Sequence, residues 1–136
     1  MGLEIFVQFF EGGEAARVSA EAIAGAFGSH LEREGGEWRR LRYRDVCCEI
    51  FANEAEGAAI DGFMVSGPVR DQGLWEDLVR VVRLGHGVLY WPSENPTLIV
   101  ADAATAADLP TEMVEGMGGV TVVSGGAGVM KELEAR

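Results

Sequence analysis

An apolar run near the start of the chain, residues 3–10, constrains the fold more than any other feature. Its odd-numbered positions are all apolar, and Phe6 and Phe10 make the other side apolar as well. Because neighbouring side chains on a strand point to opposite faces, this run predicts a strand that is covered on both sides. Residues 120–123 form a second, shorter run of the buried type. The two runs predict a sheet whose centre is enclosed.

The rest of the chain alternates between strand and helix patterns. Further strands are expected at residues 38–43, 46–52, 58–66, 88–91 and 97–101, and helices after Ser19, at residues 74–84, after Asp102, from Pro110 and after Ser124. The order βαββ, βαββ, ααβα predicts one α/β or α+β domain over residues 1–136. We expect a mixed sheet of about seven strands with helices on one or both faces. Residues 1–57 and 58–101 share the order strand, helix, hairpin, which suggests a pseudo-repeat.

Residues 38–52 contain two strand patterns joined by Arg44 and Asp45, a plausible two-residue turn. Such a turn fixes the register of the hairpin. The predicted core face pairs Tyr43 with Val46, Leu41 with Cys48 and Arg39 with Ile50. The other face pairs Trp38 with Phe51, Arg40 with Glu49 and Arg42 with Cys47.

The charge of the chain excludes two classes of partner. Its 136 residues include 22 acidic and 11 basic side chains, for a formal charge of −11. A negative surface repels phosphate backbones and anionic lipids, so we expect no nucleic acid and no membrane partner. The same field steers a basic protein toward the chain. No apolar run approaches the ~20 residues of a membrane helix.

The cysteines and the start of the chain predict a cytoplasmic protein. Cys47 and Cys48 are adjacent, and neighbours on a strand cannot form a disulfide without severe distortion. Glu4 lies where a signal peptide carries basic residues. Lys131 is the single lysine, while arginine, alanine and glycine are abundant, which indicates a GC-rich bacterial genome. With only His30 and His86 as further soft ligands, no metal or other cofactor is expected.

Six residues are candidates for binding: Trp91, Glu94, Trp75, Asp71, Arg40 and Arg42. Tryptophans beside a proline-stiffened turn (residues 92–96) are typical contact anchors, because they supply area at little entropic cost. The neighbouring acidic residues suit a cationic partner. Arg40 and Arg42 form a basic stripe suited to a carboxylate or phosphate. The glycine-rich loop at residues 124–128 is a second candidate for an anion, because it precedes a helix.

No spacing in the sequence singles out a catalytic residue. We therefore expect an acidic module that binds or inhibits a basic protein partner, as immunity proteins do. A small-molecule or anion-binding module is the alternative, through the arginine stripe or the glycine loop. An enzyme with an unrecognised carboxylate or cysteine site is a third hypothesis. Assembly into a homo-oligomer stays open.

Overall fold

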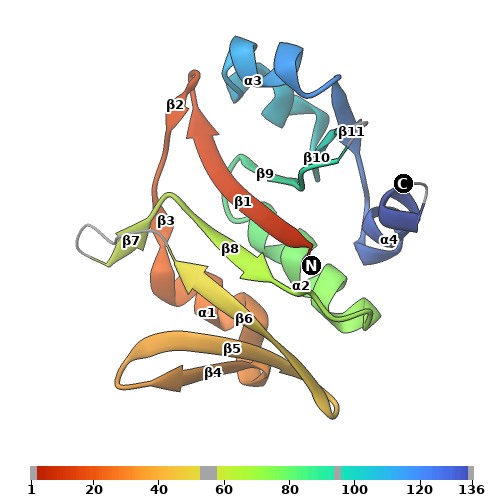
Figure 1. Ribbon diagram of the computed structural model, residues 1–136. Coiled ribbons are helices and arrows are strands. Elements are labelled where there is room, and N and C mark those ends of the chain that lie inside the picture. Colours follow the sequence, from red (N-terminus) through yellow and green to blue (C-terminus); the bar gives the residue numbers. More distant parts are fainter. Residues whose placement is uncertain (1–2, 53–57, 94–95, 135–136) are drawn as a thin grey trace.

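A computed structural model describes residues 3–52, 58–93 and 96–134. Within this part of the chain the main sheet has nine strands (Figure 1): β1 (Glu4–Glu11), β2 (Glu14–Ala15), β4 (Leu31–Glu34), β5 (Glu37–Tyr43), β6 (Val46–Ala52), β8 (Gly62–Ser66), β9 (Gly87–Tyr90), β10 (Leu98–Val100) and β11 (Val120–Val122). Its order is β11-β10-β9-β1-β8-β6-β5-β4, with β2 beside β1. Only β10 and β11 are parallel among the described strand pairs. Two short strands, β3 (Val18–Ser19) and β7 (Ala59–Ile60), pair separately.

Six helical segments accompany these strands in the described part: α1 (Ala20–Phe27), η1 (Gly28–His30), α2 (Gln72–Val82), η2 (Ala103–Asp108), α3 (Thr111–Gly116) and α4 (Gly126–Glu134). Their starts follow the expected capping chemistry. The side chains of Ser19, Asp71 and Asp102 each accept a hydrogen bond from a backbone N–H in the first turn that follows. Ser19 and Asp102 cap helices as the sequence predicted, and the cap at Asp71 starts α2 at Gln72, two residues before the predicted start at residue 74.

The main core lies between the sheet and the layer formed by α1, α2 and α4. Ile5, Val7 and Phe9 of β1 are buried there with the inward stripe of α2. In Figure 1, α1 and α2 lie behind β1, β8 and β6. The fold is therefore the mixed α/β domain that the sequence predicted, with more strands than the seven expected.

A smaller core covers part of the opposite face of the sheet. Val88, Leu98 and Val100 are buried beneath Leu109 and the apolar residues of α3. Phe10 and Tyr90 pack at its border. This layer reaches β9, β10, β11 and the end of β1, and it leaves the rest of that face without a helix from the described residues.

The predicted hairpin register is confirmed for four of its six pairs; Arg39 with Ile50 and Trp38 with Phe51 are not among the observed pairs, and Arg39, expected on the core face, is exposed. β5 and β6 pair Tyr43 with Val46, Leu41 with Cys48, Arg42 with Cys47 and Arg40 with Glu49. The predicted strand at residues 58–66 is divided into β7 and β8, and β4 was not predicted because its sequence, LERE, is mostly charged. Such charged sequences are usual at the exposed edge of a sheet.

Trp38 differs from the prediction that placed it beside Arg40 and Arg42. The register between β4 and β5 shifts at Glu32 and Arg33, which inserts an extra residue into β5. Beyond this bulge the Trp38 ring packs edge-on against Phe63 of the main core, with ring centroids 6.3 Å apart. The bulge has reversed the side of the strand on which Trp38 lies.

The strand–helix–hairpin order recurs as β1–α1–β5–β6 and β8–α2–β9–β10. The hairpin strand next to the centre is the second one, β6, in the first unit and the first one, β9, in the other. The two units therefore differ in how their hairpins join the sheet. A duplication over residues 1–57 and 58–101 stays a prediction.

Helix α4 packs closely on α2 through Gly126. A Cβ atom at this position would lie 2.5 Å from the backbone nitrogen of Glu76 and 2.8 Å from the carbonyl carbon of Trp75. The Gly126 N–H also donates a hydrogen bond to the Glu76 carboxylate. Only glycine allows two backbones to approach this closely.

We expect Gly126→Ala to destabilise the protein by about 1–3 kcal/mol, because the new methyl group meets backbone atoms that cannot move aside. Urea unfolding measures the change. Gly116→Ala, at the end of α3, is the matched control, since nothing lies within 4 Å of its Cβ position. An equal loss of stability in both variants would contradict the close packing of α4 on α2.

Candidate functional site

The part of the sheet without a helical cover carries two rows of side chains. The strand registers align Phe51, Met64, Phe6 and Tyr90 across β6, β8, β1 and β9. At positions two residues further along each strand, the same registers align Glu49, Ser66 and Glu4 across β6, β8 and β1. We call this surface the open face. It places an apolar row beside a row that carries the carboxylates of Glu4 and Glu49. Through the pairing of Glu49 with Arg40, this second row continues to the arginine stripe.

The apolar row is a continuous, partly exposed surface. Phe51 is 48% exposed, and Met64, Phe6 and Tyr90 are half-buried. The rings of Phe6 and Tyr90 stack with centroids 5.4 Å apart, and the Tyr90 hydroxyl donates to Gln8 Oε1 at 2.9 Å. Four adjacent strands separate the ends of the row by about 14 Å. A contiguous apolar surface of this kind marks a contact site more often than scattered exposed residues do.

The carboxylates of the open face have no cation of their own. Glu4 and Glu49 are exposed, and neither forms an ion pair within the described residues. Arg40 is opposite Glu49 in the register, yet its Nε atom lies 3.5 Å from Glu32 instead. The negative charge of this face is therefore available to an external cation.

Most described arginines form ion pairs with the protein's own carboxylates, although Arg40 and Arg42 share a single carboxylate, Glu32. Six ion pairs join Arg33 to Glu21, Arg39 to Glu34, Arg40 and Arg42 to Glu32, Arg44 to Asp71, and Arg80 to Asp77 in the described residues. The five pairs that do not involve the buried Asp77 add little to stability. Their consequence is electrostatic, because the net charge of −11 is expressed by the carboxylates that are left over.

The predicted arginine stripe exists, but Glu32 occupies it. Its two carboxylate oxygens lie 3.5 Å from Arg40 Nε and 2.7 Å from Arg42 Nε. The hydrogen bond and charge of Arg42 hold the pKa of Glu32 below its ordinary range, and Glu32 in turn raises the pKa of Arg42. An external carboxylate or phosphate would have to displace this residue.

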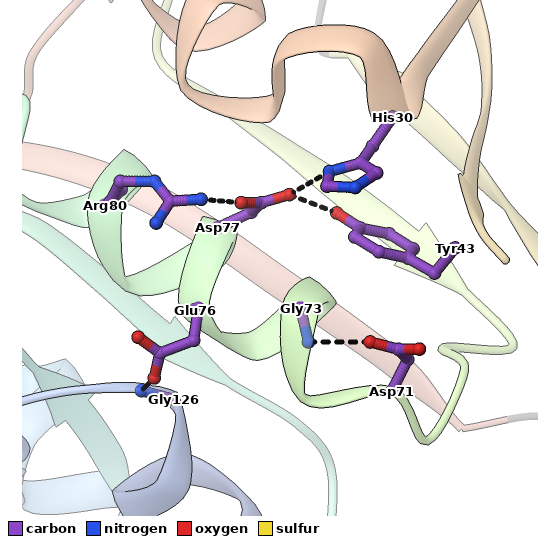
Figure 2. A network of polar contacts seen from close by, with 8 residues as sticks. All are labelled: His30, Tyr43, Asp71, Gly73, Glu76, Asp77, Arg80 and Gly126. Atoms are coloured by element: carbon purple, nitrogen blue, oxygen red, sulfur yellow. Dashed lines mark hydrogen bonds and ion pairs between the residues drawn. The ribbon is translucent and has the colours of Figure 1, made fainter.

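The predicted anion loop is filled in the same way. The backbone N–H of Gly126, at the start of α4, donates to the carboxylate of Glu76 (Figure 2). The carbonyl oxygen of Ser124 accepts from Arg83 Nη2 at 2.6 Å. These hydrogen bonds therefore attach the loop before α4 to α2 and to Arg83 at its end.

The two tryptophans proposed as contact anchors lie in the core. Trp75 is 0% and Trp91 3% exposed. Trp75 belongs to the inward stripe of α2, and alternation along β9 turns Trp91, like Leu89, toward the same core. Neither ring is available to a partner in this structure. Glu94 lies outside the described residues.

Asp71 has a structural role at the start of α2. Its Oδ1 atom accepts from Gly73 N at 2.8 Å, and its Oδ2 atom lies 3.5 Å from Arg44 Nε (Figure 2). Only part of its carboxylate is therefore open to a cation. Its use in binding stays a prediction.

A buried polar network, which the sequence did not reveal, joins α2 to η1 and β5. Asp77 is 1% exposed and accepts from the Tyr43 hydroxyl at 2.6 Å, from His30 Nδ1 at 2.8 Å and from Arg80 (Figure 2). Burial raises the pKa of Tyr43, which keeps the hydroxyl protonated as a donor. The network satisfies a carboxylate inside the core and connects three elements.

The two cysteines have different surroundings. Cys48 is buried, and burial raises the pKa of its thiol. Cys47 is exposed on the same side of β6 as Glu49. His30 is held by Asp77 and His86 by Asp108. Among the described residues no group of three metal-ligating side chains gathers, and no helix is long and apolar enough to cross a membrane.

His86 and Asp108 join three segments at one end of the sheet. Asp108 accepts from His86 Nδ1 and, through its other oxygen, from Gly12 N at 3.0 Å, while its backbone oxygen accepts from Gly13 N at 2.9 Å. The pair also lines a cavity of about 590 Å³. Its contacts tie the β1–β2 turn to η2 and to the turn before β9.

We expect Tyr43→Phe to lower the free energy of unfolding by about 1.5–3 kcal/mol, because a hydrogen bond to a buried carboxylate is lost. Tyr90→Phe removes a hydroxyl bonded to a neutral amide and should cost about 0.5–1.5 kcal/mol. Urea unfolding of both variants makes the comparison. A smaller loss at Tyr43 than at Tyr90 would argue against a tightly held Asp77.

The Asp108 contacts predict a dependence of stability on pH. The Gly12 N–H and His86 hold the pKa of Asp108 below its ordinary value. Stability from this group is therefore present above about pH 4 and is lost as the pH falls through the lowered pKa. We expect the melting temperature of wild type to exceed that of Asp108→Asn at pH 7. The difference between the two melting temperatures should disappear as the pH is lowered. A gap independent of pH would contradict the linkage.

Comparisons with known proteins indicate no function for this chain. No protein-family model, curated protein or solved structure matches it. The function therefore has to be inferred from the arrangement of its own residues. Of the surfaces described above, the open face is the one whose carboxylates, Glu4 and Glu49, form no ion pair within the described residues.

Proposed function

We propose that this chain is a protein-binding module of the inhibitor kind, and that a basic protein docks on its open face. The observation that carries the proposal is the pairing of an exposed apolar row with unpaired carboxylates. Apolar side chains at the centre of a contact supply affinity, and charges at its rim supply specificity and a faster encounter.

The charge distribution supports a cationic partner over any other. Six arginines are engaged by carboxylates of the chain itself, in the described residues, so the surface offers few free cations to an acidic protein. Glu4 and Glu49 lie exposed at the edge of the apolar row. A partner with basic groups around an apolar centre would complement both features at once.

The anion-binding alternative has less support. Both places that suited an anion, the arginine stripe and the loop before α4, hold a carboxylate of the chain, Glu32 and Glu76. A ligand would have to compete with groups that are tethered in place and so present at high effective concentration. The enzyme alternative also has less support, because the Cys48 thiol is buried and burial raises its pKa.

Affinity capture from an extract of the source organism tests the proposal. We expect one stoichiometric basic protein to be retained by wild type and by the control Glu112→Lys/Glu115→Lys on α3. The double variant Glu4→Lys/Glu49→Lys changes the net charge by the same amount on the open face and should lose the partner. All four positions are exposed, so folding is preserved.

The association rate of the purified partner provides the second readout. It should fall about tenfold or more as salt rises from ~0.01 M to ~0.15 M, because the Debye length shortens from about 30 Å to about 8 Å. Three results would overturn the proposal: no stoichiometric partner, an acidic partner, or equal retention by the open-face variant and wild type.

A further inference from the structure

A cavity of about 490 Å³ adjoins the open face where β5 and β6 approach β7 and the start of α1. Its floor is apolar, formed by the buried residues Ile50 and Ile60. The aromatic rings of Trp38 and Phe51 belong to its walls. Phe51 is also the end of the apolar row, so the cavity and the open face share this residue.

The rim of the cavity is acidic. Glu37 and Glu49 line it and form no ion pair within the described residues. Arg39 lines it too, but its Nε atom lies 3.4 Å from Glu34 Oε2, which offsets its charge. The cavity therefore combines aromatic walls with two unpaired carboxylates.

We propose that this cavity receives a cationic side chain, an arginine or a lysine, as the anchor of the partner. The methylene stem of such a side chain packs on apolar and aromatic walls while its charged head reaches the rim. An aromatic face attracts the cation directly, and a guanidinium bonds a carboxylate through two N–H groups. An apolar side chain would fill the floor but leave both carboxylates unused.

The bulge in β5 makes this cavity possible. It turns Trp38 away from the side of Arg40 and Arg42 and against Phe63, which fixes the ring edge-on as a rigid wall. With regular alternation, Trp38 would lie on the side of Arg40 and Arg42 instead of against Phe63. The inference depends on the proposed function in one respect: the basic partner is what supplies the cationic side chain.

Titration with N-acetyl-arginine methylamide tests the cavity without the partner. The probe should shift the indole N–H resonance of Trp38 in ¹⁵N NMR spectra, and the uncharged citrulline analogue should bind at least about threefold more weakly. Trp75 and Trp91 are buried and serve as internal references. Equal shifts from both probes, or none from arginine, would overturn the inference.

Variants of residues inside and outside the cavity test where the arginine probe binds. Glu49→Gln and Phe51→Ala should each weaken the response to the arginine probe, while Glu4→Gln, on the open face but outside the cavity, should leave it unchanged. If Glu4→Gln weakens it as much as Glu49→Gln, the cation is attracted by the general field and the cavity is not its site. The comparison of the arginine and citrulline probes uses only wild-type protein. It therefore remains valid if a variant fails to fold.

The result separates the two proposals. A Trp38 response to arginine, with no basic partner captured, would support the cavity and overturn the proposed function. Capture of a basic partner through the open face, with no response to arginine, would support the function and overturn the cavity as its anchor point.

Discussion

The central strand β1 is covered unequally, and much of the structure follows from that. One side of β1 is buried along its length by the helical layer, whereas the other side is covered only near Phe10, by η2 and α3. Burial of Ile5, Val7 and Phe9 fixes the register with β8 and β9. That register aligns Phe6 with Met64 and Tyr90, and so produces the apolar row of the open face.

The acidic side chains have two separate roles in this molecule. One group bonds to the chain's own donors: Glu32 to a pair of arginines, Glu76 to the start of α4, and Asp77 to the buried hydroxyl of Tyr43. The other group, which includes Glu4, Glu37 and Glu49, has no such partner in the described residues. The first group organises the fold, and the second group gives the surface its charge.

The sequence predicted the features that depend on neighbouring residues better than it predicted the pairing of distant strands. The turn at Arg44 and Asp45 fixes the register of its hairpin, and Ser19 caps the first helix as expected, because both depend on neighbours in sequence. The position of β1 between β8 and β9 depends on residues more than 50 positions away, as Phe6 with Met64 shows, and no local pattern encodes it. The charged strand β4 carried no apolar signal at all.

The candidate site shows the same division. Acidity and a cationic partner were expected from composition, but the aromatic residues chosen for contact, Trp75 and Trp91, lie in the core. Phe51 and Trp38 take their place at the surface, the latter because a bulge reversed its side. Glu32 could not be identified as the partner of Arg42 before its strand was known to pair with β5.

The position of β1 between two strands that come much later in the sequence has a consequence for protein synthesis. Two of its neighbours, β8 and β9, begin at Gly62 and Gly87, so this apolar strand leaves the ribosome long before either exists. At roughly 5–20 residues per second, β1 waits on the order of ten seconds for β9. During that interval an unpaired apolar strand is prone to aggregate, which makes nascent-chain chaperones important for the yield of this protein.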